Sequence, residues 1–188
     1  DNDTKSSIGI GHTRWATHGL PNDINAHPHQ SGNKKISLVH NGIIENYAIL
    51  KQELEERGHT FLSETDTEVL VHLIEEIQEK GNLPLFEAVR VALSEVVGAY
   101  AIVLLDQDNP NQLIAARKSS PLVIGIGENE YFLASDATPI VEYTKNVIYL
   151  DDDEIALIDL KDGLTLKTIS NEIKTPYIQE LEMHLEAL

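Results

Sequence analysis

The spacing of hydrophobic residues changes character near the middle of the chain. From residue 45 to about residue 96, apolar residues recur three and four positions apart, which is typical of helices, and after Gly98 they form short runs typical of strands. The helical pattern predicts three helices, at residues 45–57, 65–81 and 84–96. The strand pattern predicts strands at residues 99–106, 112–118, 121–127, 130–136, 146–160 and 164–169.

Four shorter elements are predicted outside these blocks. They are strands at residues 8–14 and 36–40 and helices at residues 137–143 and 177–188. The dipeptide Asn41-Gly42 predicts a tight turn, because both residues adopt positive φ at low cost. Consecutive strands without helices between them argue against a parallel, doubly wound sheet. The sequence therefore predicts an α+β fold, with helices packed beside antiparallel strands.

Composition narrows the range of partners. The 188 residues include 31 acidic and 14 basic ones, a formal net charge of -17, and this charge repels nucleic acid and anionic membrane surfaces. No apolar run is long enough to span a bilayer. The absence of cysteine excludes disulfides, thiolate zinc sites and a cysteine nucleophile within these residues. We expect a cytoplasmic protein without a cofactor.

Three polar segments carry side chains suited to binding and catalysis. Arg14, in HTRWATHG, offers a planar fork that fits a carboxylate. Asn41 and Gly42, in HNGIIENY, can together donate two hydrogen bonds to one developing oxyanion. Asp66, in SETDTE, can hold an ammonium group. Each also has an ordinary interpretation: a surface ion pair, a turn, and an acidic residue near a helix start capped by Thr65.

Together these segments identify a family. HTRWATHG, NAHPH, HNGIIENY, SETDTE and AARKSSPLVIGIGENEYFLASDATPI, in this order, resemble the class II glutaminase domain of glucosamine 6-phosphate synthases, the glutamine–fructose-6-phosphate aminotransferases. The resemblance runs from about residue 8 to residue 170. Amidophosphoribosyltransferases and asparagine synthetases share the Asn-Gly and acidic segments, but Trp15–His18 and Gly42–Asn46 fit the glucosamine synthases better.

The resemblance implies a fold and its boundaries. It implies a four-layer αββα sandwich of the N-terminal nucleophile type, with the leading strands missing. Residues 1–170 would be a glutamine amidotransferase domain truncated at its N-terminus, because the chain starts at Asp1 without an initiator methionine. Residues 171–188 would begin a linker to a sugar isomerase domain. Unpaired sheet edges predict self-association, so we expect a homo-oligomer.

The resemblance also assigns roles to individual residues. Arg14 would bind the α-carboxylate of glutamine or glutamate, and Asp66 its α-ammonium group. Trp15, Thr17 and His18 would complete the substrate pocket. Asn41 and Gly42 would form the oxyanion hole. The family's nucleophile, an N-terminal cysteine, is not among these residues, so we expect this chain to hydrolyse no glutamine.

Three alternatives remain open. The chain could be a non-catalytic amino-acid-binding module, or the glutaminase domain of another class II enzyme such as an amidophosphoribosyltransferase. A metal hydrolase is disfavoured, and no metal is predicted, because the clustered histidines lack a zinc-type arrangement; they are His12, His18, His27, His29 and His40. His72, in the middle of a predicted helix, is interpreted as a packed or half-exposed side chain and not as a ligand.

Overall fold

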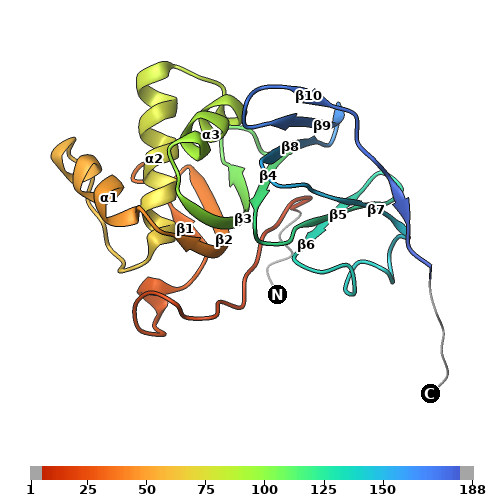
Figure 1. The fold of residues 1–188 in the computed structure, drawn as a ribbon, viewed down its shortest axis with the longest axis horizontal. Helices are drawn as coiled ribbons and strands as arrows, with labels where there is room; N and C mark the ends of the chain where they lie inside the picture. Colours follow the sequence, from red (N-terminus) through yellow and green to blue (C-terminus); the bar gives the residue numbers. More distant parts are fainter. Residues whose placement is uncertain (1–5, 183–188) are drawn as a thin grey trace.

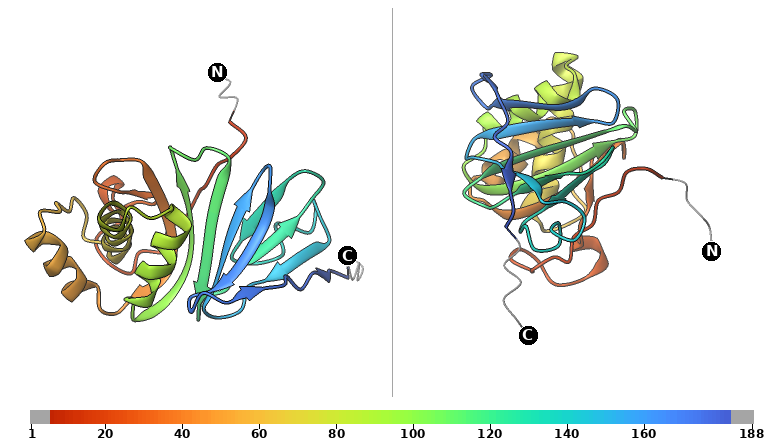
Figure 2. Two further views of the ribbon diagram at one scale, coloured as in Figure 1. Left: turned by 90° about the horizontal axis from the view of Figure 1, so that it is seen from above. Right: turned by 90° about the vertical axis from the view of Figure 1, so that its right-hand side faces the viewer.

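The computed structural model describes residues 6–182. Helices cover one face of a large sheet, and a smaller sheet packs on its other face (Figures 1 and 2). The helices are a short 3-10 turn η1 (Asp23–Asn25), α1 (Tyr47–Glu56), α2 (Asp66–Gly81) and α3 (Leu85–Ser94). None of the helices in this part of the chain is long and apolar enough to cross a bilayer.

The large sheet has seven antiparallel strands in the order β1-β2-β3-β4-β8-β9-β10. Its strands are β1 (His29–Gln30), β2 (Ile36–Ile44), β3 (Gly98–Asp106), β4 (Gln112–Lys118), β8 (Glu154–Asp159), β9 (Gly163–Thr168) and β10 (Ile173–Lys174). The small sheet has the order β11-β7-β5-β6, also antiparallel. Its strands are β5 (Val123–Ile126), β6 (Tyr131–Ala134), β7 (Asn146–Tyr149) and β11 (Gln179–Glu180).

Two apolar layers hold the fold together. Between the helices and the large sheet, Leu70 and Ile74 of α2 pack with Leu38 and Ile102, all fully buried. Between the two sheets lie smaller and branched side chains, namely Ala101, Ala115, Leu122, Ile124, Ile148, Leu150, Ala156, Ile158 and Leu166. Burying each large aliphatic side chain stabilises the fold by about 1.5–3 kcal/mol. These layers fix α2 and β2, the two elements that carry the site.

The structure confirms the α+β class and the three central helices, whose bounds lie within two residues of the prediction. Thr65 caps α2 as predicted, accepting a hydrogen bond from the Glu68 N–H at 3.3 Å. The helix ends one residue before Asn82, which takes a left-handed conformation with φ +48°. Asn82, rather than Gly81 alone, therefore terminates the helix.

Four of the predicted strands and helices were wrong. Residues 8–14 belong to no strand among the described residues, and residues 137–143 form a bend and consecutive turns on the outer face of the small sheet. The run 146–160 is two strands, β7 and β8, because the chain turns at Asp153, with φ +64°, and passes from one sheet to the other. Residues 179–180 form β11 instead of a helix. The rest of that predicted helix, residues 183–188, lies outside the described residues.

Asn41 and Gly42 do not form the predicted turn. Strand β2 continues through them to Ile44, opposite Ala101 and Tyr100 of β3. Gly42 nevertheless has the positive φ expected of this dipeptide, +122°, and a Cβ there would lie 2.2 Å from the Ala99 carbonyl oxygen. Pairing along the whole of β3 therefore overrides the local turn preference, and only glycine fits where the two backbones meet.

Candidate functional site

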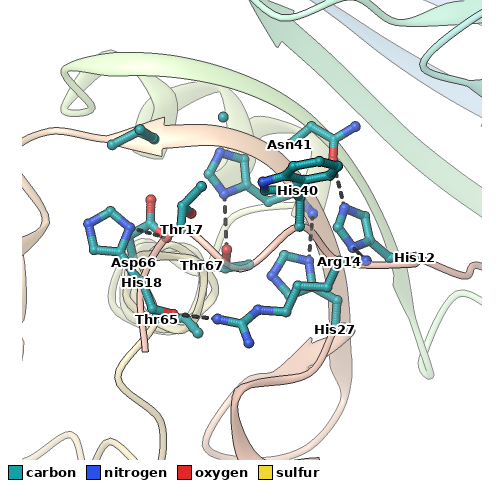
Figure 3. A pocket seen from close by; sticks show the side chains of 13 residues that line it. His12, Arg14, Thr17, His18, His27, His40, Asn41, Thr65, Asp66 and Thr67 are labelled. Carbon is teal, nitrogen blue, oxygen red and sulfur yellow. Dashed lines mark hydrogen bonds and ion pairs between the residues drawn. The ribbon is translucent and has the colours of Figure 1, made fainter. Parts of the chain in front are cut away.

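A cavity of about 320 Å³ opens where β2, the start of α2 and the segment after residue 11 meet (Figure 3). All seven residues predicted for the site line it, namely Arg14, Trp15, Thr17, His18, Asn41, Gly42 and Asp66. The structure also places there several residues without a predicted role in binding, namely His12, His27, His40, Ile43, Thr65 and Thr67. The three polar segments singled out in the sequence thus meet at one place.

The start of α2 fixes Asp66. The Glu68 carboxylate accepts hydrogen bonds from the Leu62 and Ser63 N–H groups at 2.8 and 2.7 Å, which anchors the chain before the helix. Burial tends to raise the pKa of Glu68, but hydrogen bonds from His72, Leu62 and Ser63 outweigh it and lower the pKa to about 2. Glu68 is therefore ionised and structural, and it leaves Asp66 free to face the cavity.

The two carboxylate oxygens of Asp66 have different surroundings, one in the backbone structure and one at the cavity. Its Oδ2 accepts a hydrogen bond from the Ile44 N–H at 2.7 Å, and its Oδ1 lies 3.8 Å from His18 Nδ1. Within residues 6–182, His18 Nδ1 is buried without a hydrogen-bond partner. A buried polar atom of this kind costs free energy unless a ligand satisfies it. Asp66 Oδ1 and His18 Nδ1 therefore mark a polar contact point for a ligand.

A short hydrogen-bond chain orients the Asn41 amide. The Arg14 backbone N–H donates to His12 Nδ1 at 2.8 Å, so in neutral His12 the proton resides on Nε2. His12 Nε2–H then donates to Asn41 Oδ1 at 2.6 Å. The Asn41 NH2 group is thereby turned away from His12 with its donors available (Figure 3). His12 is a positioning residue that sequence reasoning missed; its place two residues before Arg14 was the available signal.

Arg14 holds the backbone of its own loop. It has φ +37°, an uncommon conformation for a residue with a side chain. Its guanidinium donates to the carbonyl oxygens of Leu20 at 3.1 Å and Gly19 at 3.5 Å, and to that of His18. These bonds fold residues 14–20 into a loop around the half-buried guanidinium. Arg14 thus shapes the cavity besides lining it.

Two histidines of the cavity, His27 and His40, have a lowered pKa. Burial, together with repulsion from His12, His29, His40 and Arg14, lowers the pKa of His27 to about 3. Burial also lowers the pKa of His40, although Asp66 opposes the shift. His40 Nδ1 pairs with Thr67 Oγ1 at 3.0 Å beneath the cavity. Arg14, which also lines the cavity, brings it a permanent positive charge.

Trp15 and Thr17 lie at the solvent side of the cavity. The Trp15 side chain is 92% exposed, whereas an indole usually buries most of its surface. Thr17 is also exposed, and His18 is half-buried with its ring edge against Tyr47 at 5.1 Å. Trp15 therefore does not fill the core.

Comparison with known proteins agrees with this geometry. The model of the glutamine amidotransferase domain family matches residues 2–177. The chain is 56% identical over 186 residues to the glutamine–fructose-6-phosphate aminotransferase [isomerizing] of Bacteroides thetaiotaomicron, covering 99% of the chain and 30% of that protein. It is 52% identical over 182 residues to the protein of the same name from Pyrococcus horikoshii, covering 96% and 30%. The chain thus spans about 30% of the length of these curated relatives.

Solved structures resemble it as well. The glutamine phosphoribosylpyrophosphate amidotransferase from B. subtilis, complexed with ADP and GMP, superposes with a TM-score of 0.69 at 30% identity, covering 86% of this chain and 35% of that chain. This likeness confirms the sandwich fold of the N-terminal nucleophile amidotransferases that the resemblance implied. With a family model matching nearly the whole sequence and the three motifs gathered in one cavity, the chain belongs to the glutamine amidotransferase domain family.

Proposed function

We propose that the cavity binds L-glutamine and that the chain is the glutaminase part of a glutamine–fructose-6-phosphate aminotransferase. The observation that carries this proposal is the arrangement of Arg14, Asp66 and Asn41 around one cavity of about 320 Å³. A free amino acid needs one cationic partner, one anionic partner and donors for its side-chain carbonyl. This cavity offers all three.

Each group of the amino acid has a matching partner. Asp66 Oδ1 receives the α-ammonium group, since Oδ2 is already engaged by the Ile44 N–H. The N–H groups of Arg14 that do not bind the loop carbonyls bind the α-carboxylate. His18 Nδ1, which has no hydrogen-bond partner within residues 6–182, gains one from the bound amino acid. Thr17 adds a hydroxyl, and Trp15 screens the mouth from solvent.

The amide end of glutamine lies beside β2 in this proposal. The Asn41 NH2 group and the Gly42 N–H together stabilise the oxyanion that forms when the side-chain amide is attacked. The attacking group would be a cysteine thiol, and none of the 188 residues is a cysteine. We therefore predict binding of glutamine without release of ammonia. Ammonia release by the purified chain at the rate of a complete amidotransferase would contradict this.

The acceptor is proposed from the relatives. Identity of 56% to a glutamine–fructose-6-phosphate aminotransferase, against 30% to a phosphoribosylpyrophosphate amidotransferase, favours fructose 6-phosphate. Because the chain spans only about 30% of such a protein, we propose that a sugar isomerase domain of the same polypeptide uses the ammonia. A cytoplasmic location for hexosamine synthesis is part of this proposal.

Calorimetric titration of L-glutamate, the product of hydrolysis, tests the pocket without needing the nucleophile. Asp66→Asn is the sharpest variant, because the amide oxygen still accepts from the Ile44 N–H while the charge is lost. We expect affinity to fall about 10–100-fold, the effect of one charge-assisted hydrogen bond. Glu64→Gln, which removes an exposed charge two residues away, is the control and should bind normally. Equal affinities in both variants would overturn the proposal.

Self-association completes the proposal for partners. Strand β6 is the last strand of the small sheet and pairs only with β5 among the described residues. Unpaired strand edges favour association with another chain. We propose that the chain forms homo-oligomers through this edge. Sedimentation velocity over a concentration series should show a rising mass, and a constant monomer mass would contradict it.

A further inference from the structure

A second cluster of ionisable side chains lies away from the glutamine cavity, between the middle of α2 and the loop that follows α1. His59, His72 and Glu75 bring one ligand atom each to within 4.8 Å of one another, and no other group of three does so among the described residues. They face a cleft of about 860 Å³ that shares no lining residue with the glutamine cavity. We propose that these three side chains bind a divalent transition-metal ion of the zinc class.

The distances between the ligand atoms suit such an ion. His59 Nδ1 and His72 Nδ1 are 2.9 Å apart, and His72 Nδ1 is 3.9 Å from Glu75 Oε2. Tetrahedral bonds of about 2.0–2.1 Å to zinc place neighbouring ligand atoms about 3.3 Å apart. Shifts of roughly half an ångström, within the reach of small side-chain rotations, bring these two distances to that value. The His59 and Glu75 ligand atoms lie within 4.8 Å of each other. Two imidazoles and a carboxylate are the donor set of many zinc sites with an open position.

The outer nitrogens of both histidines face carboxylates. His59 Nε2 lies 2.9 Å from Glu76 Oε2, and His72 Nε2 lies 3.8 Å from Glu68 Oε1. A carboxylate at the outer nitrogen places the ring proton there and leaves a lone pair on Nδ1. For His59, whose contact with Glu76 is of hydrogen-bond length, this makes Nδ1 an acceptor. His72 Nε2 is too far from Glu68 for a hydrogen bond, so His72 Nδ1 either donates its proton to His59 Nδ1 across 2.9 Å or loses that proton when an ion binds between the two nitrogens. Glu75, within reach as a third ligand, favours the metal ion over the proton.

The surroundings make the cluster rigid and negative. Glu75 is fixed by hydrogen bonds from the Gly32 and Asn33 N–H groups, both at 2.8 Å, so the loop at residues 31–34 closes over it. His72 and Glu75 stand three residues apart on one face of α2. Four glutamates of α2 line the cleft, namely Glu68, Glu75, Glu76 and Glu79. Lys34 and Arg57 are the basic residues lining it, so the cleft attracts cations.

The test is calorimetric titration of ZnCl2 into chelator-treated chain, with Co2+ absorption in the visible range as a spectroscopic readout of tetrahedral nitrogen and oxygen ligation. We expect one equivalent to bind and to raise the Tm. His59→Gln and His72→Gln should each abolish the cobalt band. Glu76→Gln, which removes the outer partner of His59, should weaken binding about 10–100-fold.

Glu79→Gln is the matched control, because it removes the same charge from the same helix and cleft but no proposed ligand. It should bind zinc normally. If His72→Gln fails to fold by circular dichroism, His59→Gln, in a loop, decides the question. Absence of stoichiometric zinc binding would show that His59 and His72 share only a proton. Zinc binding that is lost in His27→Gln but kept in His59→Gln would show that the ion binds to the histidines of the other cavity. Either result overturns the proposal. Glutamate titration of the same variants reports separately on the glutamine cavity.

Discussion

The histidines of the two cavities beside α2 have neighbours of opposite charge. In the proposed glutamine cavity, the tilted rings of His12 and His27 have centroids 4.3 Å apart near Arg14, and burial and mutual repulsion keep the pKa of His27 low. In the cleft farther along the helix, His59 and His72 contact glutamates instead. The first arrangement suits a zwitterion held by Arg14 and Asp66, and the second suits a cation. The charged neighbours, more than the histidines, determine what each cavity can bind.

The largest expected difference between the two regions concerns glycine. Gly42→Ala should destabilise the chain by at least about 3 kcal/mol, because a Cβ at φ +122° meets the Ala99 carbonyl oxygen at 2.2 Å. Gly58, which leads to His59, also has a positive φ of +96° but has nothing within 4 Å of its Cβ position. Gly58→Ala should therefore cost only about 1–2 kcal/mol of backbone strain. Urea unfolding measures both, and equal costs would show that β2 and β3 can separate at Gly42.

Arginine offers the second comparison. Arg14→Lys keeps the charge but loses the fork that binds the carbonyls of residues 18–20, so we expect glutamate affinity to fall about 10–100-fold. Residues 14–20 should also become more sensitive to proteolysis. Arg57, 3.7 Å from Glu76 and half-exposed, is the counterpart in the cleft. Arg57→Lys should change the free energy of unfolding by less than about 0.5 kcal/mol. Normal glutamate binding by Arg14→Lys would mean that the loop closes without the fork.

The smallest expected effect is a dependence of stability on pH. His27 titrates at about 3 in the fold, against an ordinary value of 6.5, so on acidification the unfolded chain takes up a proton first. The stabilisation is complete above pH 6.5 and is lost as the pH falls from 6.5 towards 3. We expect a contribution of about 1 kcal/mol, because the ring is partly exposed to screening by water. His27→Asn should flatten the stability profile in this window, and an unchanged slope in urea titrations would contradict the assignment.

Much of the fold follows from local patterns. The three central helices were predictable because their apolar stripes, Thr65 as cap and Gly58 as stop are all encoded within a few residues. The positions of most strands were predictable, but the sheet that each strand joins was not. Nothing in the run 146–160 shows that Asn146–Tyr149 and Glu154–Asp159 belong to different sheets, since that depends on pairing with β5 and β4.

The sequence by itself determined the helices, the motifs that identify the family and the residue types available for binding an amino acid. Tertiary structure alone decided that Asn41 and Gly42 extend a strand and that His12 orients the Asn41 amide. It also decided that the Arg14 guanidinium donates hydrogen bonds to carbonyl oxygens of its own loop. It also brought His59 beside His72, a contact that no sequence pattern indicates. The physical reason is the same in each case. Hydrogen-bond partners and charges that lie far apart along the chain set these geometries, and local propensity carries no information about them.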